Sequence, residues 1–129
     1  MSGWKKLAAA SAGGGASNFG FAATDNSAYQ SSIYGEGIVK DSSGNYIAVG
    51  RVFTSDRYGY LIKMASDGSV LASYRMDLTA FAGEPSSICI DSSDNIYVGG
   101  RGSGGGGQNP LIMKFNSSFV LQWAYVYDW

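Results

Sequence analysis

The only two glutamates of the chain, Glu36 and Glu84, are its first candidates for chemistry. Each comes before the first predicted strand of a repeated unit, and glycosidases use two carboxyl groups about 5–10 Å apart as acid and as base or nucleophile. Relative to the repeat, however, the two positions differ by two residues, so nothing in the sequence requires the carboxylates to converge. We therefore expect the protein not to be a glycosidase.

The other residue types exclude most other enzyme chemistry. The chain has no histidine, which removes the most common general base and most zinc sites. Asp41 and Asp91 open two Asp-Ser-Ser turns, but the alternating carboxylates and closing glutamate of a calcium loop are missing, so we expect both to accept hydrogen bonds within their own turns. The glycine runs 13–15 and 102–107 lack the Lys-Ser/Thr pair of a phosphate loop. We predict no catalytic residue, no metal ion and no cofactor, and a protein that is not an enzyme.

Charge and hydropathy exclude further classes of partner. The formal net charge is −1 and no basic stripe is visible, so we expect neither nucleic acid nor a membrane as a partner. No stretch has the length and apolar character of a membrane span. The single cysteine, Cys89, lies between two isoleucines, and this setting predicts a small buried residue in a strand.

Two arginines are the best candidates for binding. Arg51 and Arg101 occupy equivalent positions at the end of a predicted second strand, so the repeat would place them on one rim of the protein. Together with Tyr58 and Tyr60 they could bind an anionic glycan or a neighbouring subunit. The alternative is that they are solvated charges that pair with a nearby aspartate, which contributes little to stability.

These arginines each end a segment that occurs twice, at a spacing of 50 residues. Residues 41–51 read DSSGNYIAVGR and residues 91–101 read DSSDNIYVGGR, so six of the eleven positions are identical. Periods of 20–50 residues are typical of propellers and other repeat architectures. The repeat therefore describes how the chain is built.

Each period predicts four strands, because residue types alternate as a pleated strand requires and turn residues separate the segments. Residues 41–45 and 65–69 predict hairpin turns with glycine where a positive φ is needed. The predicted strands of the first period are 37–40, 45–51, 58–64 and 69–76, and those of the second are 87–90, 95–101, 110–115 and 119–126. Four antiparallel strands form one propeller blade, so we predict an all-β, propeller-like fold with two four-stranded antiparallel blades.

Two segments are predicted to precede the blades. Residues 19–22 have the register of a lone N-terminal outer strand, and residues 1–17, which contain three consecutive glycines, form an extended arm for docking. The two-blade domain then spans 18–129, with repeats at about 31–77 and 81–127. Two blades do not close a ring and would leave apolar faces exposed, so the chain must associate with copies of itself or with another protein, or belong to a longer propeller. Three copies would supply six blades, which makes a trimer the first expectation.

Aromatic residues near both ends are candidates for a protein–protein interface. In the arm, Trp4 is a large aromatic residue among small ones and needs a pocket, and Lys5 and Leu7 are its neighbours. At the other end, four aromatic residues occur within seven positions: Trp123, Tyr125, Tyr127 and Trp129.

The repeat resembles the bacterial and phage β-propeller repeats of the D-x-x-G-N-x-Y-x-x-G type, here residues 41–50. A later strand of that type reads like residues 60–64, followed by a turn like residues 67–71. This chain departs from the pattern at two places: Asp94 replaces the turn glycine of the second repeat, and the glycine run 102–107 loosens the hairpin after Arg101. The resemblance implies a propeller fold but no particular function.

The first residues, SGWKKLAAASAGGG at 2–15, are similar to the N-terminal arms of structural proteins from tailed phages, marine ones especially. This resemblance implies a virion component that is assembled in the host cytoplasm, in the tail or as a capsid appendage, with other virion proteins and copies of itself as partners. The alternative function is a carbohydrate-binding module that recognises a host-surface glycan through the Arg51 and Arg101 rim.

Overall fold

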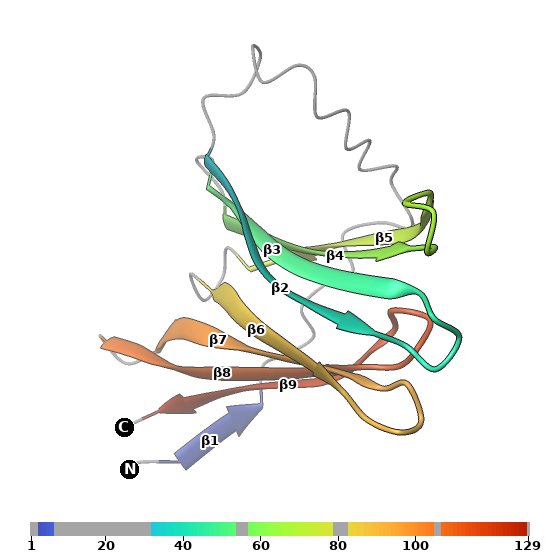
Figure 1. Cartoon of the computed structure of the whole chain (residues 1–129). Helices are drawn as coiled ribbons and strands as arrows, with labels where there is room; N and C mark the ends of the chain where they lie inside the picture. Colours follow the sequence, from blue (N-terminus) through green and yellow to red (C-terminus); the bar gives the residue numbers. More distant parts are fainter. Residues whose placement is uncertain (1–2, 7–31, 54–56, 79–82, 105–106, 129) are drawn as a thin grey trace.

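The computed structural model describes residues 3–6, 32–53, 57–78, 83–104 and 107–128, and every regular element in these ranges is a β-strand (Figure 1). The first sheet has the order β2-β3-β4-β5, with strands Ser32–Lys40, Tyr46–Phe53, Arg57–Met64 and Val70–Asp77. The second sheet contains β6, β7, β8 and β9 in sequence order, with strands Glu84–Ile90, Ile96–Gly104, Gly107–Phe115 and Leu121–Asp128. All neighbouring strands are antiparallel, and the two sheets face each other without closing into a barrel.

The all-β class and the four strands of each repeat are confirmed, although most strands are longer than predicted. Strand pairing continues into the glycine run after Arg101, which corrects the expectation that this run loosens the hairpin. Instead β7 continues to Gly104 and β8 begins at Gly107, with these two residues directly paired. The predicted lone strand at 19–22 lies outside the described residues.

A fifth strand extends the second sheet beyond the predicted count of four. Strand β1, Gly3–Lys6, pairs antiparallel with β9, so that Trp4 is opposite Tyr127 in the backbone register (Figure 1). Its residues belong to the segment predicted as a docking arm. An unpaired edge strand leaves a row of backbone N–H and C=O groups open, and β1 pairs with residues 125–128 of β9.

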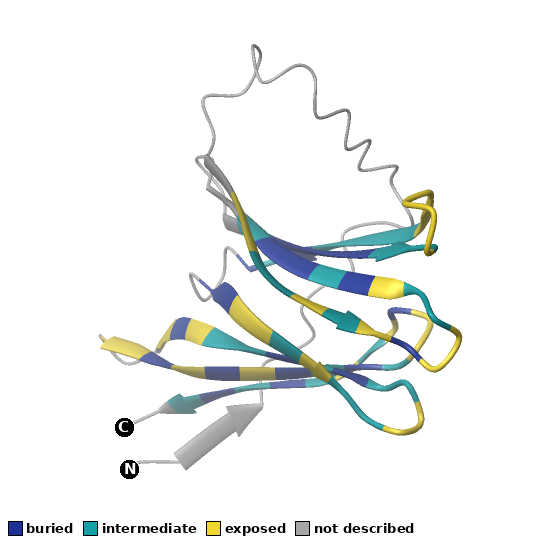
Figure 2. Cartoon of the chain, viewed as in Figure 1, coloured by how far each residue is buried: buried dark blue, intermediate teal, exposed yellow. Residues whose placement is uncertain are grey.

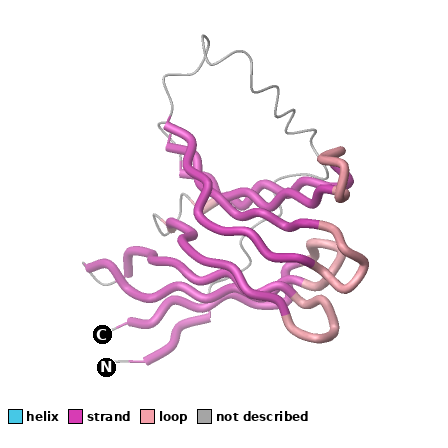
Figure 3. The backbone as a smooth tube through the Cα atoms, in the orientation of Figure 1, coloured by secondary structure: helices cyan, strands magenta, loops and turns pink. Residues whose placement is uncertain are grey.

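Four tight turns, which join β2 to β3, β4 to β5, β6 to β7 and β8 to β9, lie at the same end of the sheets (Figure 3). In each turn, the backbone N–H of the first residue donates to the carbonyl oxygen of the fifth, and the N–H of the fourth donates to the carbonyl oxygen of the first. The donor–acceptor distances are 2.8–3.0 Å. The fourth residue has positive φ, as in a type I turn followed by a bulge. It is Gly44 and Gly68 in the first sheet, but Asp94 at φ 60° and Phe119 at φ 62° in the second. Glycine is therefore confirmed at the two predicted turns.

The apolar core lies between the two sheets, on the faces that they turn toward each other (Figure 2). Alternate residues of β3 and β4 supply one side, and alternate residues of β7, β8 and β9 supply the other, as the period of two requires. The fully buried members are Ile47, Val49, Leu61, Met76, Leu78, Ile96, Val98, Leu111, Met113 and Phe115. Phe119 is also buried there, which gives a reason for its unusual turn conformation.

The two repeats also share a β-bulge. The register of β2 and β3 shifts around Glu36, and that of β6 and β7 shifts around Ser86, one repeat later. Beside each bulge, β3 or β7 carries a glycine that touches a neighbouring backbone atom. A Cβ on Gly50 would be 2.3 Å from the carbonyl oxygen of Tyr34, and one on Gly100 would be 2.2 Å from that of Glu84. The second glycine of the repeat is thus required by close packing.

We predict that Gly50→Ala lowers the free energy of unfolding by about 1–3 kcal/mol, because the added methyl group forces a backbone shift. The matched control is Gly35→Ala, directly opposite in β2, where a Cβ has no heavy atom within 4 Å. Urea denaturation of both variants measures the effect. Equal losses for the two would contradict this explanation of the glycine.

Candidate functional site

Arg51 and Arg101 lie at equivalent places in the two sheets, as predicted, but their partners differ. Each arginine is directly opposite the residue 17 positions before it, Tyr34 in the first sheet and Glu84 in the second. The guanidinium of Arg51 therefore lies over the ring of Tyr34, 5.0 Å from its centroid. Arg101 instead forms an ion pair with the carboxylate opposite to it.

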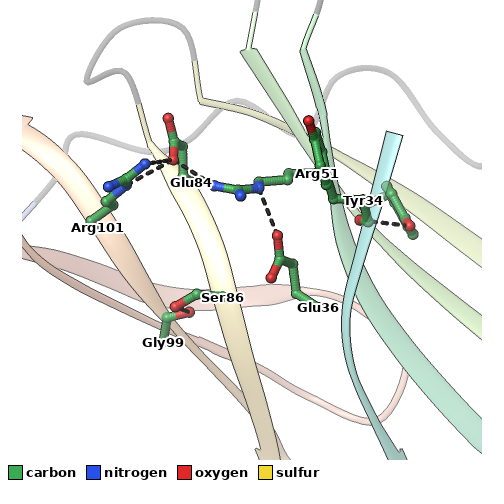
Figure 4. Close-up of polar contacts among 8 residues, drawn as sticks. Tyr34, Glu36, Arg51, Glu84, Ser86, Gly99 and Arg101 are labelled. Atoms are coloured by element: carbon green, nitrogen blue, oxygen red, sulfur yellow. Dashed lines mark hydrogen bonds and ion pairs between the residues drawn. The ribbon is translucent and has the colours of Figure 1, made fainter. Parts of the chain in front are cut away.

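The carboxylate of Glu84 joins the two arginines across the sheets (Figure 4). One of its oxygens, Oε2, is 2.6 Å from Nη1 of Arg51 and 2.7 Å from Nε of Arg101. Nε of Arg51 forms a second ion pair, at 2.6 Å, with Oε1 of Glu36. Nη1 of Arg101 donates to Gln108 at 2.8 Å. We call Glu36, Arg51, Glu84 and Arg101 the charged cluster.

Glu36 and Glu84 converge, although their different positions in the repeat did not require it. Glu36 is the extra residue of the β2 bulge, and Glu84 begins β6 in the other sheet. Their side chains are 80% and 95% buried, and the guanidinium of Arg51 occupies the space between them. A glycosidase would need that space for the scissile bond. The arrangement is that of a partly buried ion-pair network that links two sheets.

Tyr58 and Tyr60 do not join this cluster. Tyr60 is opposite Gly50, so it lies on the other face of the first sheet from Arg51. Its hydroxyl donates to the carbonyl oxygen of Tyr34 at 3.1 Å. The ring of Tyr58 is covered by the guanidinium of Arg75, at 4.3 Å from its centroid. Because successive residues of a strand point to opposite faces, the two tyrosines lie on one face of the first sheet and Arg51 on the other, so the predicted binding rim does not form.

A second polar link joins the sheets at their turns. Asp94, which replaces the turn glycine, accepts from the N–H of Ser42 at 2.9 Å and from its hydroxyl at 2.5 Å. The departure from the repeat pattern therefore has a structural reason. An aspartate tolerates the positive φ of this position and its side chain can reach the turn of the preceding repeat.

Asp41 and Asp91 organise their own turns, as expected. In each turn the Oδ1 atom accepts from two backbone N–H groups, and Oδ2 accepts from the asparagine four residues later. Lys63 adds an ion pair to Asp41 at 2.7 Å. Burial alone would raise the pKa of Asp41, but the hydrogen bonds from Lys63 and Asn45 and the charge of Lys63 outweigh it and lower the pKa to about 2.

In the second repeat, the turn aspartate Asp91 is bound by a tyrosine, whereas its equivalent Asp41 in the first repeat is bound by Lys63. The hydroxyl of Tyr97 donates to Oδ2 of Asp91 at 3.1 Å, and Nζ of Lys114 lies 5.4 Å from the centroid of the tyrosine ring. The hydrogen bond from Asn95 is the main reason why the pKa of Asp91 is lowered.

Tyr97 belongs to an aromatic surface on the side of the second sheet that faces away from the first. Its ring is 6.1 Å from that of Trp123, which is 5.5 Å from that of Tyr125. Lys114 lies between Tyr97 and Trp123 in the register, and Ile112, directly opposite Tyr125, is 37% exposed. We call Tyr97, Ile112, Lys114, Trp123 and Tyr125 the outer face. Sequence reasoning singled out only Trp123 and Tyr125 of this set, and an alignment of the repeats by register would have found the others.

Cys89 lies in β6, as predicted, but it is exposed rather than buried. It is opposite Tyr97 and therefore on the same side of the sheet as the outer face, which its apolar sequence neighbours could not show. Of the other predicted interface residues, Trp4 and Lys5 are in β1 and Tyr127 is in β9. Leu7 and Trp129 lie outside the described residues.

Within the described ranges, no group of three or more acidic or cysteine side chains is placed to hold a metal ion, and no helix long and apolar enough to cross a membrane occurs. Comparisons of the chain with protein-family models, with curated proteins and with solved structures gave no match.

We predict that Asp41→Asn reduces stability most at neutral pH. A folded pKa of about 2, below the ordinary value of 3.8, means that the ionised carboxylate stabilises the fold above about pH 4 and that this contribution is lost as the pH falls toward 2. The difference in unfolding free energy between the variant and the wild type should therefore shrink on acidification. Urea denaturation at several pH values measures it, and Asp91→Asn, without a lysine contact to the carboxylate, should show a smaller pH dependence.

We predict that Glu84→Gln lowers the free energy of unfolding by about 3 kcal/mol, because it removes the shared counter-charge of two arginines from a buried position. Arg101→Gln is the control and should cost less than about 1 kcal/mol, since the side chain of Arg101 is 49% exposed. Thermal or urea denaturation distinguishes the two. A smaller loss for Glu84→Gln than for Arg101→Gln would show that the cluster does not hold the sheets together.

Proposed function

We propose that this chain is a non-enzymatic structural protein, built of two propeller-type blades, that acts by docking its outer face on a neighbouring protein. The observation that supports this most is the aromatic outer face. An antiparallel sheet with one solvated side normally alternates apolar residues inside with polar ones outside. Here the outer side instead presents Tyr97, Trp123, Tyr125 and the exposed Ile112.

The repeat supplies a physical reason for this face. By strand register, Ile47, Leu61 and Tyr74 of the first sheet correspond to Tyr97, Ile112 and Tyr125 of the second. The first three all pack into the core between the sheets. The outer face thus occupies the positions that, one repeat earlier, bind the next sheet, and this favours a protein partner of similar shape.

The stacking of two four-strand repeats in sequence order supports the propeller-type description, in which each blade packs on the next. The similarity of residues 2–15 to the arms of tailed-phage structural proteins supports a place in a virion, in the tail or as a capsid appendage. In this proposal the partners are other virion proteins and copies of the chain itself.

Carbohydrate binding is the second candidate, and the same aromatic residues are the observation that favours it. Aromatic side chains stack on sugar rings, and Trp123 is flanked by two tyrosines. However, neighbouring rings are tilted by 54–59° and do not form one flat platform. Arg51, proposed from the sequence as part of a glycan-binding rim, is engaged with Glu36 and Glu84.

We predict that a photo-reactive benzoylphenylalanine at position 112, in the full chain within the assembled particle, forms one discrete adduct with a protein. The same residue at position 38, an isoleucine of β2 that is 60% exposed, should form none. Ile112→Glu should reduce incorporation into the particle at least about tenfold, because it places a charge in an apolar contact. Equal adducts at both positions, or unchanged incorporation, would contradict the proposal. A glycan-array signal that Ile112→Glu removes would favour the second candidate.

A further inference from the structure

We propose that the partner of the outer face is a β-sheet of the second-repeat type, with an acidic residue at two defined positions. One is an aspartate at the fourth position of its first turn, and the other is a glutamate at the start of its first strand. The proposal rests on the proposed function, because it describes the partner that the outer face would bind. Three contacts between the existing sheets carry it.

The first contact is that of Arg51 with Glu84. Arg51 is on the face of the first sheet that looks toward the second, and it binds a carboxylate of that next sheet. Arg101 is its equivalent and is directed to the outer side of the second sheet, where its side chain is 49% exposed. A glutamate at the start of a partner's first strand would meet Arg101 as Glu84 meets Arg51.

The second contact is that of Ser42 with Asp94. The N–H and hydroxyl of Ser42 both donate to the carboxylate at the fourth position of the next repeat's turn. Ser92 has the same place in its own turn and is exposed. An aspartate in the first turn of the partner would accept the equivalent pair of hydrogen bonds from Ser92.

The third contact is apolar. Val39 of β2 is partly buried against the core between the sheets, and its equivalent in β6 is Cys89, which is exposed. The strand register relates Leu61, which is fully buried, to Ile112, which is 37% exposed. The outer side of the second sheet therefore presents the equivalents of the arginine, the serine and the apolar positions by which the first sheet binds its neighbour.

The first sheet of a second copy does not have the required acids. Its residues at the two positions are Tyr34 in place of Glu84 and Gly44 in place of Asp94. The second sheet of a second copy does carry both acids, but they already bind its own first sheet through Arg51 and Ser42. A head-to-tail ring of three copies would thus lack both polar links. These differences favour a sheet from another polypeptide.

An extended chain tests this inference directly. Residues 1–128 are followed by a second copy of residues 78–128, so that the sequence connecting β5 to β6 also connects β9 to the added sheet. The added copy carries Cys89→Ser, which leaves the original Cys89 as the only thiol and a reporter on the outer face. We expect the added sheet to cover Cys89 and to slow its reaction with a thiol reagent at least about tenfold relative to the wild-type chain, because the thiol reacts only during the fraction of time that it is uncovered.

The matched control is the same extension with Glu84→Tyr and Asp94→Gly in the added copy, which gives it the residues of the first repeat. We expect Cys89 to react at least about tenfold faster in this control than in the acid-bearing extension, and its thermal unfolding midpoint to be about 4 °C lower or more. Arg101→Gln in the original sheet of the acid-bearing extension should shift both measurements in the same direction.

Equal protection by both added copies would overturn the requirement for acids, and no protection by either would overturn the docking of such a sheet. Neither result changes the photo-adduct expected at position 112 in the particle, which tests the proposed function separately. A wild-type trimer in which Cys89 is protected and the adduct at position 112 joins two identical chains would show that the partner is a second copy, and would overturn the inference.

Discussion

The contact between the two sheets is the feature on which the rest of the structure depends. Each sheet has one apolar face that must be removed from water, and the largest buried side chains lie between the two sheets. Apolar packing is not directional, so by itself it does not fix the position of one sheet relative to the other. The contacts of Asp94 with Ser42 and of Glu84 with Arg51 are directional and act at two separate places, so together they define how the sheets are placed.

The differences between the repeats are as informative as their similarity. The first repeat has Tyr34, Gly44 and Ile47 where the second has Glu84, Asp94 and Tyr97. The two acids of the second repeat reach back to the first sheet, whereas its tyrosine faces away from that sheet. Each difference therefore corresponds to a role in stacking: the two acids bind the preceding sheet, and the outer side carries aromatic residues and the partly exposed Arg101.

Most of the fold could be predicted because it depends on local patterns. The turn at 41–45 follows from Asp41, Gly44 and Asn45, whose hydrogen bonds and φ are set within five residues. The candidate site was less predictable. Whether Arg51 binds a glycan or a carboxylate depends on Glu36, which a bulge brings into position, and on Glu84, which comes from another sheet. The exposure of Cys89 likewise depends on which face of β6 is covered, and its apolar neighbours gave the wrong answer.

The sequence by itself determined the strands, the four-strand repeat and the turn chemistry, because each depends on residue alternation and on contacts between residues close in the chain. Only the tertiary structure decided which faces meet, that β1 extends the second sheet, and that Glu36 and Glu84 share one arginine. These outcomes depend on packing between parts of the chain that are distant in the sequence, as Arg51 and Glu84 are. The contacts of Arg51 depend both on how the two sheets are placed and on the position of the bulge at Glu36, and a local sequence pattern shows neither.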